Sequence, residues 1–100
     1  MTPTMTPTAV PICCFTINPP VAQTGNWVTV TSCSTYAQGG TLEFAWDWGD
    51  GTSSTGFSIN PQAQHIYTLP SDQGYPITLT VRVDQSGAEC TLTKRARVIP

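Results

Sequence analysis

The sequence predicts an all-β protein, a sandwich of about seven short antiparallel strands. Its composition is rich in threonine, valine and aromatic residues, which fit a pleated, half-buried surface. Stretches of alternating apolar and polar residues follow one another, and glycine, proline or asparagine interrupts them at regular spacing. No window combines apolar residues at helical spacing with a capping signal, so no helix is expected.

The first half of the chain is expected to hold three strands. Residues 12–17 end at Asn18-Pro19-Pro20, where two prolines remove backbone donors. In residues 27–34, valines alternate with threonines. In residues 43–48, aromatic side chains recur at every second position and so share one face, and the tight-turn signal Gly49-Asp50-Gly51 follows.

The second half is expected to hold four strands. Residues 52–59 are polar and predict a strand at a sheet edge, and 65–69 predict a short strand. A loop is expected at 70–74. The clearest period-two pattern covers 75–83, and the side chains expected to face inward are Tyr75, Ile77, Leu79, Val81 and Val83. The last strand is expected at 90–99.

Length and charge limit the classes of partner. One hundred residues suit a single domain, which we place at 12–100. Only 10% of the residues are charged and the net charge is −2, which argues against nucleic acid or an anionic membrane as partner. No apolar run approaches the ~18 residues that a membrane span needs.

Residues 1–11 form a Thr/Pro-rich segment. Alternating prolines fix φ and remove backbone donors, so this segment is expected to be extended and without a core of its own. It lacks the basic region and apolar core of a signal peptide, so export would require another leader or route. Two interpretations stay open: a linker or tail, or an arm that packs along a neighbouring subunit.

Three blocks of sequence together resemble the PKD (polycystic-kidney-disease-type) domain. They are, in order, Trp46-Asp47-Trp48-Gly49-Asp50-Gly51, then His65-x-Tyr67, then Tyr75-x-Ile77-Thr78-Leu79-Thr80-Val81, and the resemblance covers about residues 17–98. It implies an immunoglobulin-like sandwich, found mostly on extracellular and cell-surface proteins as a spacer, an adhesion module or an accessory that binds carbohydrate or protein. It implies no catalytic residues. The four cysteines and the longer loop at 70–74 depart from the family's usual pattern.

All four cysteines, Cys13, Cys14, Cys33 and Cys90, are expected at one end of this sandwich. Adjacent Cys13 and Cys14 point to opposite sides of a strand, so one can reach Cys33 and the other Cys90. The sequence leaves the pairing open. Two disulfides would indicate an oxidising compartment or an extracellular particle. One alternative, a four-thiolate zinc site, is disfavoured because there is no Cys-x-x-Cys spacing. The other alternative is free, buried thiols.

Asp47, Asp50 and His65 are the residues that suggest chemistry. The two aspartates could bind calcium, as in some members of that family, but no run of clustered carboxylates supports such a site. Capping of the turn by Asp50 and backbone hydrogen bonds to Asp47 are favoured. For His65, no motif supplies a nucleophile and an orienting group, so we expect it to pack near Trp46 and bond to backbone. No cofactor and no enzymatic activity are predicted.

Two aromatic residues are candidate ligand contacts. Trp27 stands at a strand start and Phe57 on the expected edge strand, and exposed aromatic rings stack on sugars or anchor interfaces. Alternatively, Trp27 covers the end of the core. Lys94, Arg95 and Arg97 on the last strand are expected to be a solvated, aggregation-resistant edge.

The leading hypothesis is a non-catalytic extracellular module that acts by protein contact, adhesion or spacing on a secreted or cell-surface protein. The first alternative is a small decoration protein on the outer surface of a virion or filament, with residues 1–11 on a neighbouring subunit. A further alternative is a carbohydrate-binding accessory module, with polysaccharide as its partner.

Overall fold

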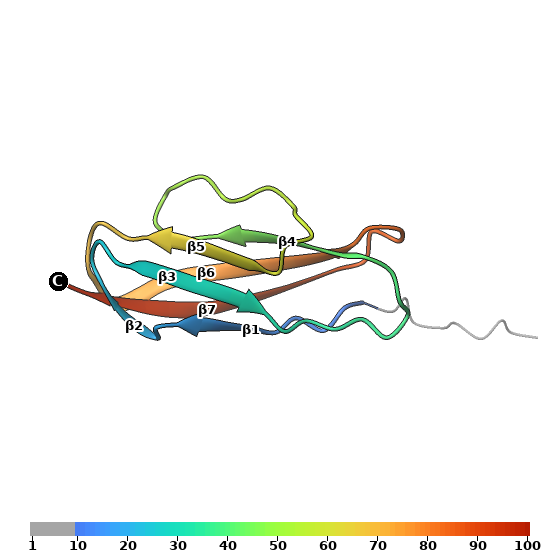
Figure 1. The fold of residues 1–100 in the computed structure, drawn as a ribbon, viewed down its shortest axis with the longest axis horizontal. Coiled ribbons are helices and arrows are strands. Elements are labelled where there is room, and N and C mark those ends of the chain that lie inside the picture. Colours follow the sequence, from blue (N-terminus) through green and yellow to red (C-terminus); the bar gives the residue numbers. More distant parts are fainter. Residues whose placement is uncertain (1–9) are drawn as a thin grey trace, which may run out of the picture.

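Two β-sheets pack face to face in the computed structural model, which describes residues 10–100 (Figure 1). The described residues form seven strands: β1 (Phe15–Asn18), β2 (Val21–Gln23), β3 (Trp27–Ser32), β4 (Leu42–Asp47), β5 (Gln62–Ile66), β6 (Ser71–Val83) and β7 (Glu89–Ile99). One sheet has three strands in the order β1-β3-β5, and the other has four in the order β2-β7-β6-β4. The predicted all-β sandwich is confirmed.

The pairing departs from the prediction at one place, because β2 runs parallel to β7, with Val21 opposite Arg97. Every other pairing between these strands is antiparallel. After β1 the chain leaves the three-stranded sheet and crosses to β2, in the other sheet, through Asn18-Pro19-Pro20. A strand of three residues with one buried side chain, Ala22, is too short to show a periodicity, which is why the sequence did not reveal it.

The core lies between the sheets and follows the period-two pattern. In β6, Ile77, Leu79 and Val81 are fully buried, as predicted from their alternation with threonine. From the facing sheet, Val28 and Val30 of β3 are equally buried. Full burial of each such side chain stabilises the fold by about 1.5–3 kcal/mol. The inner residues of these strands therefore fix which faces of the sheets meet.

Residues 52–59 are not a strand. This segment follows the edge of the four-stranded sheet, as expected, but it pairs with β4 irregularly. Phe44 and Ser58 exchange two backbone hydrogen bonds, whereas the backbone N–H of Trp46 donates to the Thr55 side-chain Oγ1 at 2.9 Å. Because a hydroxyl takes the place of a backbone carbonyl there, the ladder does not continue.

Three other strands also differ from their expected ranges, and the first of them, expected at 12–17, is β1, which begins at Phe15. The strand expected at 65–69 is β5, shifted to Gln62–Ile66, where glutamines face outward. Of the residues 70–74 expected in a loop, 71–74 are part of β6, which pairs with β7 from Ser71 onward through a register shift before Tyr75. Gly74 lies in that irregular stretch, with φ of +91° and its Cα against Arg95 and Ala96 of β7.

The basic residues of β7 each have a partner. Lys94 Nζ donates to the carbonyl oxygen of Phe15 in β1 at 2.7 Å, so this side chain joins the two sheets. Arg95 donates to the carbonyl of Gly74, and Arg97 pairs with Asp72. The described residues include no helix with the length and apolarity required to cross a bilayer.

Candidate functional site

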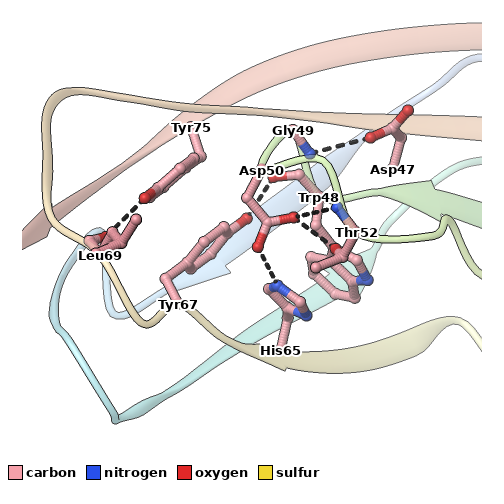
Figure 2. A network of polar contacts seen from close by, with 9 residues as sticks. All are labelled: Asp47, Trp48, Gly49, Asp50, Thr52, His65, Tyr67, Leu69 and Tyr75. Carbon is pink, nitrogen blue, oxygen red and sulfur yellow. Dashed lines mark hydrogen bonds and ion pairs between the residues drawn. The ribbon is translucent and has the colours of Figure 1, made fainter.

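The turn after β4 begins with Asp47 and Gly49. Asp47 Oδ1 accepts the backbone N–H of Gly49 at 3.0 Å, so this aspartate bonds to backbone in the way the sequence analysis expected (Figure 2). Gly49 has φ of +76°, and a Cβ there would overlap the carbonyl oxygen of Pro76 in β6. Only glycine fits, because both the backbone conformation and the close approach exclude a side chain.

Asp50 ties this turn to strand β5. Its Oδ1 accepts hydrogen bonds from the backbone N–H and the hydroxyl of Thr52, and its Oδ2 lies 2.7 Å from Nε2 of His65 (Figure 2). Partial burial by itself would raise the pKa of Asp50, but the hydrogen bonds from Thr52 and His65 outweigh it and hold that pKa below its ordinary value. The carboxylate is therefore stabilised in its charged form.

His65 lies in a continuous series of aromatic rings. It stacks on Trp48, with ring centroids 4.7 Å apart, and meets the edge of Tyr67 at the same distance. The expectation that His65 bonds to backbone was wrong, because its Nε2 bonds to the carboxylate of Asp50 instead. Its expected packing near Trp46 is indirect, since Trp48 lies between the two rings and stacks against Trp46.

Tyr67 completes the network from β5 to the turn. Its hydroxyl, buried in the core, donates to the carbonyl oxygen of Trp48 at 2.7 Å (Figure 2). Burial, together with the nearby negative charge of Asp50, raises the pKa of Tyr67 well above its ordinary value. Tyr75 stacks on Tyr67, with centroids 4.2 Å apart, and donates to the carbonyl of Leu69.

The polar and aromatic contacts of this site connect segments that are far apart in the sequence. A carboxylate that orients a histidine is two parts of a nucleophilic site, but among the described residues no hydroxyl or thiol is hydrogen-bonded to His65, whose ring face is stacked on Trp48. Within residues 10–100 no pocket was found and no three potential metal ligands cluster. The network instead holds the turn, β5 and the start of β6 together.

The cysteines lie at the end of the sandwich where the chain enters. Cys13 is bonded to Cys90 of β7, and Cys14 to Cys33, just after β3. The first disulfide joins residues 77 positions apart and links the entering segment to the four-stranded sheet. The second disulfide joins the residue before β1 to the residue after β3, two neighbouring strands of the three-stranded sheet. No described cysteine is free.

The two candidate aromatic contacts belong to different surfaces. Trp27, at the start of β3, is 57% exposed on the three-stranded sheet, so it does not close the end of the core. Phe57 is less exposed and covers the guanidinium of Arg82, 3.8 Å from the ring centroid, on the four-stranded sheet. Arg82 is itself held by Glu43. A single ligand site that contains Trp27 and Phe57 is therefore not formed.

A model of the PKD domain, compared with the sequence, matches residues 8–99. The chain belongs to the PKD domain family. The predicted resemblance is confirmed, and the Asp50–His65 pair of this PKD domain joins two of the three blocks on which the resemblance rested. No curated protein matches.

One solved structure gives a close likeness to this PKD domain. It superposes with a TM-score of 0.78 and 30% sequence identity over 89% of the chain, and its title concerns the promiscuous specificity of carbohydrate-binding modules from the β-sandwich superfamily. The PKD domain spans only 34% of that longer chain. The likeness supports the sandwich assignment independently of the family match.

Sequence reasoning identified the members of the network but not all of their partners. Asp50, His65 and Tyr67 were singled out by their motifs, whereas Thr52 was given no role and Tyr75 was expected only to face inward, without the partners Tyr67 and Leu69. An Asp-Gly-Thr sequence could have indicated Thr52, because a hydroxyl two residues after an aspartate commonly bonds back to it. The link from Phe57 to Arg82 has no signal in the sequence, since it depends on where the irregular segment lies.

Proposed function

We propose that this PKD domain is a non-catalytic extracellular spacer that transmits tension between the segments attached at its two ends. The observation that carries the proposal is the Cys13–Cys90 disulfide. The chain enters at the end of the sandwich that holds this disulfide, and Pro100 lies at the opposite end (Figure 1). A load applied at both ends is therefore directed along the length of the sandwich.

The disulfide shortens the loaded path. Tension that enters before Cys13 passes through the sulfur atoms to Cys90, and residues 14–89 become a closed loop that carries no load. Only the part of β7 after Cys90 remains in the path. It pairs with β6 along its length and with β2 near its end, so its backbone hydrogen bonds share the load in shear.

Single-molecule force spectroscopy tests this role. In the oxidised chain, pulled from both ends, only the residues after Cys90 lie in the loaded path, and because they already form an extended strand their full extension adds only about 5 Å. In Cys13→Ser/Cys90→Ser the sandwich can unfold, and the increment rises to roughly 200 Å, because the Cys14–Cys33 loop stays closed. Equal increments in the two proteins would contradict the proposal.

A matched control removes the other disulfide. Cys14→Ser/Cys33→Ser leaves the loaded path through Cys13–Cys90 intact, so its increment should stay as short as that of the oxidised chain. Both double variants lose one disulfide, so a difference between them reports the path of the load and not stability alone.

The proposed setting is extracellular. Two disulfides favour an oxidising compartment, and a disulfide-bonded PKD module is consistent with a location outside the cell. The alternative of a virion or filament decoration protein depends on an arm at residues 1–11, most of which lies outside the described residues. It stays a prediction.

Carbohydrate binding is the second candidate function. Trp27 favours it, because this large aromatic side chain is more than half exposed on a sheet face. The likeness to a structure titled for carbohydrate-binding modules supports the same candidate. Retention on immobilised polysaccharide is the measurement that tests it, and Trp27→Ala tests whether this side chain takes part. The absence of retention on a broad glycan panel would remove this candidate and leave the spacer role unaffected.

A further inference from the structure

The outer face of the three-stranded sheet carries no charged side chain. Its outward positions follow from the buried ones, since Val28 and Val30 of β3 and Phe15 of β1 point into the core. We call the remaining, outward set the neutral face: Thr16, Asn18, Trp27, Thr29, Thr31, Gln62, Gln64 and Ile66. Most of these side chains are hydroxyls or amides.

Two cross-strand pairs hold the polar groups of this face in place. Gln62 Nε2 donates to Thr31 Oγ1 at 3.2 Å, and Gln64 Nε2 donates to Thr29 Oγ1 at 3.1 Å. Each glutamine amide has a second N–H and a carbonyl oxygen, and each threonine hydroxyl still has its own proton to donate. The pairs therefore present donors and acceptors in fixed positions, which lowers the entropy lost on binding.

An apolar pair lies at one end of the neutral face. Trp27 stands opposite Ile66 in the β3–β5 register, and the indole is 57% exposed. From Trp27 to Thr31 the face extends about 13 Å along β3, and its three strands span about 10 Å. It is thus a shallow surface with one aromatic platform and a row of neutral hydrogen-bonding groups beside it.

We propose that the neutral face binds an extended, uncharged polysaccharide, with Trp27 stacked on a sugar ring and the Gln–Thr pairs bonded to the hydroxyl groups. An acidic polymer would lose hydration here without meeting a positive charge, which makes it a poor ligand. A protein partner would find only two apolar side chains on this face, Trp27 and Ile66, and both lie at its end, whereas protein interfaces have an apolar centre. The inference rests on the second candidate function, carbohydrate binding, and is independent of the spacer role.

Affinity electrophoresis and pull-down on neutral matrices (cellulose, chitin, mixed-linkage β-glucan and galactomannan) and on acidic ones (alginate and pectate) test the inference. We expect retention on at least one neutral matrix and none on the acidic ones. Because no ion pair contributes, retention should persist in about 1 M NaCl. Trp27→Ala should weaken binding about tenfold or more, and Gln64→Glu should weaken it severalfold.

Phe57→Ala is the matched control, since it also removes a partly exposed aromatic ring but from the other sheet. It should bind like the original chain. Retention that survives Trp27→Ala and Gln64→Glu would keep the carbohydrate candidate and overturn the neutral face, whereas retention on acidic matrices alone would overturn the ligand class. No retention at all would remove both. A concentration-dependent dimer that Trp27→Ala abolishes would assign the face to a second copy instead and overturn the inference.

Discussion

Nε2 of His65 lies 2.7 Å from Oδ2 of Asp50, and this contact joins the turn after β4 to strand β5 across the two sheets. Both side chains are largely shielded from water, with 16% and 14% of their surface exposed. Because the same carboxylate also holds Thr52, one residue fixes the turn and its distance from the facing sheet. The motif that identifies the family is thus a structural clamp.

Asp50→Asn should destabilise the domain by about 1–2 kcal/mol, because the amide keeps the shape but loses the charge-assisted hydrogen bonds. His65→Gln should cost more, since it also removes the stacking on Trp48. In a double-mutant cycle measured by urea unfolding, the two changes should be coupled by about 1 kcal/mol. Additive effects would show that the contact contributes nothing.

The pH dependence follows from the lowered pKa of Asp50. Its folded pKa lies below the ordinary value of 3.8, so as the pH falls the unfolded chain takes up the proton first. The stabilisation is complete above that value and is lost as the pH falls through the lower, folded pKa. The difference in unfolding free energy between the original chain and Asp50→Asn should therefore shrink below about pH 4. A constant difference from pH 5 to pH 2 would contradict this account.

Tyr67→Phe should cost about 1–2 kcal/mol, because it leaves the buried carbonyl of Trp48 without its donor. Tyr75→Phe is the control: its hydroxyl bond to Leu69 is exposed, so its loss should cost less. Because the pKa of Tyr67 is raised, ionisation above pH 10 favours the unfolded chain and stability falls there. In a spectrophotometric titration one of the three tyrosines should ionise only with unfolding.

The inner faces could be predicted from sequence and the outer surfaces could not. Alternation in β6 revealed Ile77, Leu79 and Val81 as core because threonine stands between them. Strand β5 gave no such signal, since glutamine alternates there with alanine and histidine. Which sheet carries Trp27 and which carries Phe57 depends on strand order, a property of long-range pairing that local patterns do not contain.

Gly49→Ala should destabilise the fold by about 3 kcal/mol or more, because the backbone has a positive φ and the new Cβ would overlap Pro76. Gly51→Ala is the matched control in the same turn. It has φ of +85° but no atom within 4 Å of the added carbon, so it should cost only about 1 kcal/mol. Equal costs, measured by thermal or urea unfolding, would mean that the approach of the turn to β6 is not a constraint.

The disulfide connectivity gives the last prediction. The native protein should show no reactive thiol after denaturation without reductant. Because adjacent Cys13 and Cys14 stay on one proteolytic peptide, partial reduction, alkylation and sequencing are needed, and they should assign Cys13 to Cys90 and Cys14 to Cys33. In the chain-entropy model, Cys13→Ser/Cys90→Ser loses about 4.5 kcal/mol and Cys14→Ser/Cys33→Ser about 3 kcal/mol, because the first disulfide closes the longer loop. A disulfide between Cys13 and Cys33 would contradict this assignment. It would then be Cys14, one residue further along, that passes the load to Cys90.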